Sequence, residues 1–168
     1  GVFFDSDGDG TRQVTWWVGP AAGILVLDRN GDGVINDGGE ISFKGDLQGA
    51  VSDLEGLRAY DSNGNGFFDS SDAMFGQFRV WQDANQDGVS SSTELKSLSD
   101  YGISAIGLTR KMTGHAIEGA DDNVIYATSD VVHADGSITT AGDVFLSYDK
   151  PAAQPDHSYA TPQFNRHP

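Results

Sequence analysis

The 168-residue chain contains no cysteine. Disulfide bonds, thiolate nucleophiles and zinc sites built on cysteine are therefore excluded. Basic residues are also scarce, because 10 Lys and Arg stand against 25 Asp and Glu, which gives a formal net charge of −15. Phosphate backbones and anionic lipids are bound by basic surfaces, so this balance argues against nucleic acid and membrane-surface partners.

Several other signals are missing. No apolar run approaches the length of a membrane span, and no signal peptide is visible. The sequence begins at Gly1 without Met, so we expect a piece of a longer protein. HExxH, GxSxG and phosphate-binding glycine loops are absent, and we interpret the four scattered histidines as surface residues. Paired carboxylates are too numerous for a glycosidase-like pair to be singled out or excluded. Enzyme activity therefore stays open, with no catalytic set in view.

The sequence does have short loops in which acidic and amide residues alternate. The clearest is DANQDGVSSSTE, residues 83–94, with oxygen-bearing side chains first, third and fifth, glycine sixth and glutamate twelfth. This is the spacing of an EF-hand calcium loop, in which the seventh residue binds through its carbonyl. The expected ligands are Asp83, Asn85, Asp87, Val89 and Glu94. A plain Asp/Asn/Gly turn is the alternative, and the recurrence of the pattern favours the ion.

Three further stretches repeat the pattern less regularly. In residues 61–72 the closing acid is the shorter aspartate, so we expect weaker binding. In residues 28–40 the acid stands thirteenth, and Gly38-Gly39 can accommodate the extra residue. In residues 5–16 the twelfth residue is Trp16, so this is either a partial site completed from elsewhere or an Asp-rich turn. The expected ligands are Asp61, Asn63, Asn65, Phe67 and Asp72; Asp28, Asn30, Asp32, Val34 and Glu40; and Asp5, Asp7, Asp9 and Thr11.

Calcium is the expected ion, in two to four copies. Magnesium prefers octahedral sites that retain water, whereas these loops offer a nearly complete shell of protein oxygens. Weak sites of this kind are useful where calcium is millimolar, so we expect a secreted or cell-surface protein.

The patterns between the loops predict an α+β fold, with EF-hand-like loops linked by short helices and strands. Ser52 and Glu55 form a capping-box pattern that predicts a helix to Tyr60. A second helix is expected over Ala73–Gln82, joining loops 61–72 and 83–94 into a pair, and a third after Glu94. Gly23–Leu27 is consistent with a buried strand or a helix end.

The second half of the chain predicts a small antiparallel β region over residues 103–148. Ile103–Thr109 is expected to be a strand, and the runs 123–133 and 137–148, joined through Asp135-Gly136, predict a hairpin. We place the calcium-binding module at residues 1–149. Residues 150–168, rich in proline and polar residues, are expected to be a flexible tail or linker.

Three stretches resemble the calcium-dependent self-processing module of large secreted RTX-type proteins. They are ILVLDRNGDGVINDGGE (Ile24–Glu40), YDSNGNGFFD (Tyr60–Asp69) and the run from Phe78 to Ile103 that begins FRVWQDANQDG. The similarity covers roughly residues 2–148, and its most specific part is Arg79–Gly88. The GGxGxDxUx repeats of the RTX β-roll are absent.

The resemblance implies calcium-induced folding and autocatalytic cleavage of an Asp-Pro bond upstream of the module. The aspartate side chain would attack its own carbonyl, and the activated acyl group would pass to water or to a lysine amine. This chain contains no Asp-Pro dipeptide, so the scissile bond is missing from it. Three hypotheses follow: a calcium-folded module, a self-processing module, and a dockerin-like protein-binding module, for which the short spacing of the last two loops is unfavourable. Neighbouring domains of the parent protein are expected partners, and a separate protein partner stays open.

Overall fold

The computed structural model describes residues 2–5, 9–15, 22–50, 52–118, 124–148 and 157–164. These residues form a mostly antiparallel β structure in which eleven strands belong to one hydrogen-bonded sheet. Among them only Asp53–Gly56 (α1) is α-helical, and it is four residues long. The α+β prediction of EF-hand-like loops linked by helices is therefore wrong. Within the described part of the chain, no helix is long and apolar enough to cross a membrane.

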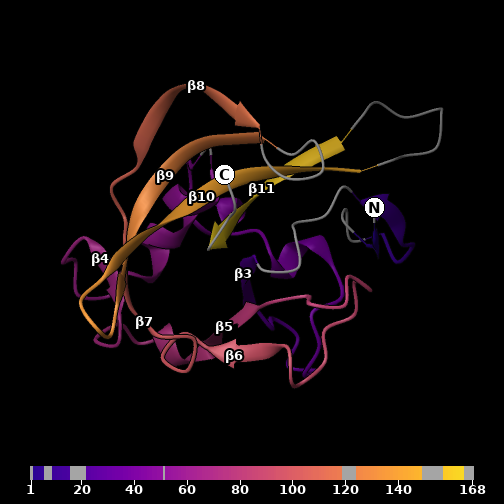
Figure 1. Ribbon diagram of the computed structural model, residues 1–168, viewed down its shortest axis with the longest axis horizontal. Coiled ribbons are helices and arrows are strands. Elements are labelled where there is room, and N and C mark those ends of the chain that lie inside the picture. The colour runs from indigo at the N-terminus through magenta and orange to yellow at the C-terminus, as the bar shows by residue number, and fades with distance from the viewer. Residues whose placement is uncertain are drawn as a thin grey trace.

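The main path through the sheet runs β4-β7-β9-β10-β11-β3-β5-β6. Figure 1 shows β8, β9, β10 and β11 arching across one half of the molecule, with β5 and β6 in the other half. The strands are β1 (Val2–Phe4), β2 (Gln13–Thr15), β3 (Gly23–Leu27), β4 (Phe67–Asp69), β5 (Phe78–Trp81), β6 (Leu95–Ser97), β7 (Ile103–Gly107), β8 (Lys111–Glu118), β9 (Val124–His133), β10 (Ile138–Tyr148) and β11 (His157–Phe164). The 3₁₀ turns are η1 (Gly38–Glu40), η2 (Lys44–Asp46), η3 (Leu57–Tyr60) and η4 (Phe75–Gln77).

The central strands β3 and β5 separate two apolar clusters. Side chains alternate between the faces of a strand, so Leu25 and Val80 point to one side while Ile24 and Trp81 point to the other. We call the first group the Phe78 cluster: Leu25, Leu27, Phe43, Leu57, Phe68, Phe75, Phe78, Val80, Leu98, Ile103, Ile106, Leu108, Val131 and Ala141. The second is the Trp81 cluster: Phe4, Ala22, Ile24, Val26, Ile35, Ile41 and Trp81.

The predicted helix over Ala73–Gln82 is wrong. The chain there makes the short turn η4 and then enters β5, which pairs with β3 from Leu27↔Phe78 to Ile24↔Trp81. Aromatic and β-branched residues suit a strand that is buried on both faces, and this environment overrides the helical spacing. The helix expected after Glu94 is also wrong, because Leu95–Ser97 is β6 and pairs with β5.

Other local predictions are confirmed. The Ser52 hydroxyl accepts a hydrogen bond from the Glu55 N–H at 3.2 Å, and α1 continues into η3 up to Tyr60. Gly23–Leu27 is a buried strand, and the hairpin of β9 and β10 turns through Gly136 at φ 85°. The expected tail does not hold for residues 157–164, because these form β11 between β10 and β3. The rest of 150–168 lies outside the described residues.

Candidate metal centres

The described residues of the four acidic loops share one hydrogen-bond pattern around the first aspartate. In each, the two carboxylate oxygens of the first aspartate accept the backbone N–H groups of the fifth and sixth residues, at 2.8 to 3.2 Å. The sixth residue is always glycine, in the left-handed region with φ between 67° and 88°. The fifth side chain accepts the N–H of the seventh residue. The four first aspartates are Asp5, Asp28, Asp61 and Asp83.

Two of the loops gather three carboxylates each. One set is Asp28, Asp32 and Glu40, and the other is Asp83, Asp87 and Glu94; within each set one oxygen from every residue lies within 4.8 Å of the others. Calcium binds oxygens at about 2.3–2.6 Å, so ligands on opposite sides of one ion are separated by roughly 5 Å. The oxygens of each set therefore have a spacing compatible with part of the oxygen shell of a single calcium ion.

Glu40 gives the clearest sign of a cation site. Its side chain is 2% exposed, and its Oε2 accepts the Asn36 N–H at 2.9 Å. Its Oε1 is buried without a hydrogen-bond partner, which is costly for a carboxylate. Burial raises the pKa of Glu40, and the neighbouring Asp37, Asp32 and Asp28 raise it further, against a lowering by the Asn36 N–H. The 3₁₀ turn η1 takes up the extra residue of this loop and brings Glu40 to the other two acids.

In the second set the most buried acid is Asp83, the first residue of its loop. It is fully buried, and this burial raises the pKa of Asp83. The hydrogen bonds from the Gly88 and Asp87 N–H groups lower the pKa, whereas the negative charges of Glu94 and Asp87 raise it. The closing Glu94 accepts a hydrogen bond from Trp81 Nε1 at 3.2 Å on its Oε2. This carboxylate set is therefore joined directly to the Trp81 cluster.

The other two loops show less. In loop 61–72 the described carboxylates are not brought into a three-acid set. Asp72 is buried and its two oxygens accept the backbone N–H groups of Ser62 and Asp69, each at 2.9 Å. In loop 5–16, Asp5, Asp9 and Thr11 are described, whereas Asp7 and Trp16 lie outside the described residues. The third-position residues Asn30, Asn63 and Asn85 each accept the N–H two residues on.

The loops pair differently from the sequence prediction. Ile35 donates its backbone N–H to Ser90 Oγ at 2.8 Å in a buried contact, and these are the eighth residues of loops 28–40 and 83–94. The pairing of loop 61–72 with 83–94 is wrong, because the eighth residue of loop 61–72, Phe68, belongs to β4 and pairs with Ile106 of β7. A hydroxyl at the eighth position of loop 83–94 was the signal that could have indicated a different partner.

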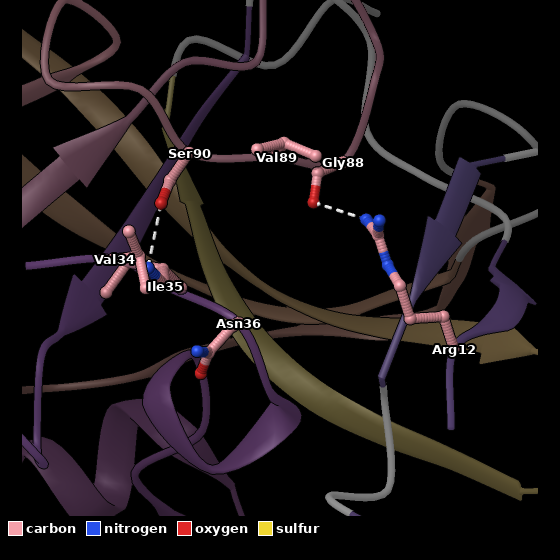
Figure 2. A pocket seen from close by; sticks show the side chains of 7 residues that line it. All are labelled: Arg12, Val34, Ile35, Asn36, Gly88, Val89 and Ser90. Atoms are coloured by element: carbon pink, nitrogen blue, oxygen red, sulfur yellow. Dashed lines mark hydrogen bonds between the residues drawn. The ribbon is translucent and has the colours of Figure 1, made fainter. Parts of the chain in front are cut away.

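Arg12 is a residue that the sequence reasoning missed. Its guanidinium donates from Nη2 to the carbonyl of Gly88 at 2.9 Å, across 76 residues of sequence. Figure 2 shows this bond beside the contact between Ser90 and Ile35. A cavity of about 220 Å³ lies between the two bonds, and the seventh residues of both loops, Val34 and Val89, line it. No pattern around Arg12 in the sequence indicates this role.

The fold and its sites define an antiparallel β domain that carries paired acidic loops on its Trp81 cluster. Residues 1–147 match the family model described as the SPM domain, and the chain belongs to this family. It is also similar to the iron-regulated protein FrpA of Neisseria meningitidis serogroup C, with 34% identity over 153 residues. That match covers 89% of this chain and 14% of FrpA, so the chain spans about a seventh of the relative's length.

Proposed function

We propose that this chain is a calcium-binding module of a large secreted RTX-type protein, and that calcium outside the cell stabilises its fold. The observation that carries the proposal is the buried Oε1 of Glu40, which has no hydrogen-bond partner. It belongs to a carboxylate that has an oxygen within 4.8 Å of oxygens of Asp28 and Asp32. The second set around Asp83 supports it. The similarity to a segment of a much longer protein fits a module within a larger chain.

The mechanism is linkage between ion binding and folding. Without a cation, each set holds three carboxylates close together, and the raised pKa values of Glu40 and Asp83 show that burial disfavours their charged forms. A calcium ion neutralises this charge only when the loop is folded, so binding stabilises the folded state. Affinities on the order of 10⁻⁴–10⁻³ M would leave the module loose in a calcium-poor cytosol and folded after export.

The ion count tests the proposal. We expect native mass spectrometry to find at least two calcium ions on the chain, and E40Q to lose one of them. Calorimetry should show at least a tenfold loss of affinity at that site, about 1.4 kcal/mol, because the glutamine side chain offers only a neutral oxygen. D100N removes the same charge at an exposed position and should keep both ions. A wild-type chain that binds no calcium at millimolar concentrations contradicts the proposal.

The same variant tests the charge argument. Because the pKa of Glu40 is raised above its ordinary 4.5 in the fold, the folded state binds this proton more tightly than the unfolded state does. The stabilisation of the fold by protonated Glu40 is therefore fully present below pH 4.5, and it is lost as the pH rises through the raised pKa. At pH 7 without calcium, E40Q should be more stable than the wild type, although it binds calcium less well.

We propose self-processing of the parent protein as a second function, which the resemblance to self-processing modules supports. One observation favours it: the N-terminal strand β1 leads to a candidate metal centre, since the Asp5 carbonyl accepts the Gly38 N–H at 2.8 Å. Calcium binding would thus order the segment that follows an upstream Asp-Pro bond. A side-chain carboxyl oxygen of the aspartate would attack the carbonyl carbon of the Asp-Pro peptide bond and form a cyclic anhydride. The peptide C–N bond would break, and the leaving proline nitrogen would take the proton of the carboxyl group. Water or an amine would then open the cyclic anhydride.

A chain extended upstream through an Asp-Pro bond tests this second function. With calcium we expect a fragment that starts with proline, seen by gel electrophoresis and intact-mass measurement. Replacing the aspartate of that bond with asparagine should abolish the fragment. If the extended chain binds calcium and stays whole, self-processing is wrong and the calcium-binding proposal stands.

A further inference from the structure

The N-terminal hairpin of β1 and β2 contacts the loops of both carboxylate sets. Arg12 Nη2 donates to the Phe3 carbonyl of the hairpin and to the Gly88 carbonyl of loop 83–94 (Figure 2). Gly88 directly precedes Val89, whose carbonyl is the expected ligand. On the other side, the Asp5 carbonyl accepts the N–H of Gly38, the first residue of the turn that carries Glu40. The hairpin therefore contacts each loop within two residues of an expected ligand.

A second contact runs through the apolar core. The Phe4 ring is 1% exposed and lies 5.9 Å from the Trp81 ring, centroid to centroid. Trp81 in turn donates from Nε1 to Glu94, the closing carboxylate of loop 83–94. A movement of β1 away from the core would thus disturb both the backbone of this loop and the residue that holds its last ligand.

We propose that the N-terminal hairpin is a calcium-dependent latch, and that Arg12 couples its docking to occupancy of loop 83–94. This inference rests on the proposed calcium binding and goes beyond it. Calcium in the loop fixes the Gly88 carbonyl in position to accept the Arg12 hydrogen bond, and the docked hairpin holds the loop in its binding conformation. Linkage is reciprocal: if calcium raises the equilibrium constant for docking of the hairpin by some factor, docking raises the calcium affinity by the same factor.

The sign of the effect separates this coupling from plain electrostatics. Arg12 brings a positive charge to an acidic loop, and a positive charge repels Ca²⁺. If charge alone mattered, R12Q would bind calcium more tightly than the wild type. If the hairpin is a latch, R12Q loses the hydrogen bonds to Gly88 and Phe3 and binds calcium more weakly.

The test uses calorimetry on the full chain, with calcium as the probe. We expect R12Q to lower the affinity of one site about fivefold, the lower end of typical coupling between sites. R12K keeps the charge but lacks the planar guanidinium that can reach two carbonyls, so it should also lose affinity. Lys96 is exposed on β6, two residues from Glu94, and K96Q provides the control for charge, with equal or higher affinity.

Hydrogen exchange measures the reverse effect, which is how strongly calcium binding stabilises the docked hairpin. In the wild type, calcium should slow exchange of the amides in residues 2–5 and 9–15, and in R12Q this protection should fall while β9 and β10 stay protected. If R12Q binds calcium as tightly as the wild type or more tightly, the latch is wrong, although calcium binding itself stands. Equal protection of the hairpin in both proteins overturns it too. A wild-type chain without calcium binding refutes the proposed function instead.

Discussion

Removal of calcium from a solution that holds it at 100 times the dissociation constant is expected to lower the free energy of unfolding of this chain by about 5 kcal/mol. A ligand that binds only the folded state contributes about 2.7 kcal/mol at a concentration 100 times its dissociation constant, and the structure offers two three-carboxylate sets. This loss is large against the 5–15 kcal/mol that is typical of a whole domain. We therefore expect the calcium-free chain to be largely unfolded or loosely packed at 37 °C.

Trp81 is the natural probe of this transition. It is fully buried in the wild-type structure and donates to Glu94 of loop 83–94. The chain has three tryptophans, so W16F/W17F leaves Trp81 as the only one. Excess chelator should shift its emission to longer wavelength and move the urea midpoint downward, and calcium should reverse both changes.

Magnesium at the same concentration is the control, and it should restore less stability because it prefers sites that keep several waters. E40Q should show about half of the calcium effect, since the set around Asp83 remains. If the urea midpoint and the Trp81 emission are the same in chelator and in calcium, the two sets do not link ion binding to folding.

The acidic loops were the part of the molecule that the sequence indicated best. The alternating oxygens and the sixth glycine depend only on local geometry, and Gly33, Gly66 and Gly88 all adopt the left-handed conformation that the pattern demands. Glu40 was expected to reach the ligands of its loop despite its thirteenth position, and it lies beside Asp28 and Asp32. What these loops bind stays a prediction.

The fold was harder to predict because it depends on contacts between distant segments. The run from Phe75 to Trp81 has apolar residues at both helical and strand spacing, and only its pairing with β3 selects the strand. The same holds for β11, whose polar and proline-containing sequence gives no strand signal but which pairs with β10 over eight residue pairs. An EF-hand loop pattern also predicts flanking helices by association, whereas here loop 83–94 leaves one strand and enters another.

The pairing of the loops was missed for a related reason. The spacing of the loops along the chain suggested that loops 61–72 and 83–94 were neighbours. In the structure, however, β4 of loop 61–72 pairs with β7. The Ser90 hydroxyl instead accepts a hydrogen bond from the Ile35 N–H, and a pattern of apolar residues cannot reveal such a contact. Arg12 reaches Gly88 from 76 residues away, and long-range side chain to carbonyl bonds leave no periodic signal in a sequence.

G56A is expected to destabilise the folded chain by about 3 kcal/mol or more, even with calcium in excess. A Cβ atom at this position would stand 1.9 Å from the Phe43 carbonyl oxygen and 2.4 Å from its carbon. These are backbone atoms and cannot rotate away, and Phe43 is itself held by a hydrogen bond from its N–H to Asp53 Oδ1 at 2.7 Å and by packing in the Phe78 cluster. Relief therefore requires α1 to move away from η2. Overpacking typically costs about 1–3 kcal/mol and occasionally more, and the short contacts to backbone atoms place G56A at the upper end of that range.

G76A provides the matched control. Gly76 also lies in a helical turn, η4, and a Cβ there would have nothing within 4 Å. The substitution should leave stability unchanged or raise it by about 0.4–1 kcal/mol, because alanine restricts the unfolded chain. Urea unfolding of both variants in saturating calcium measures the difference. Since neither glycine belongs to a carboxylate set, a G56A protein as stable as G76A would mean that α1 does not pack on Phe43, whatever the loops bind.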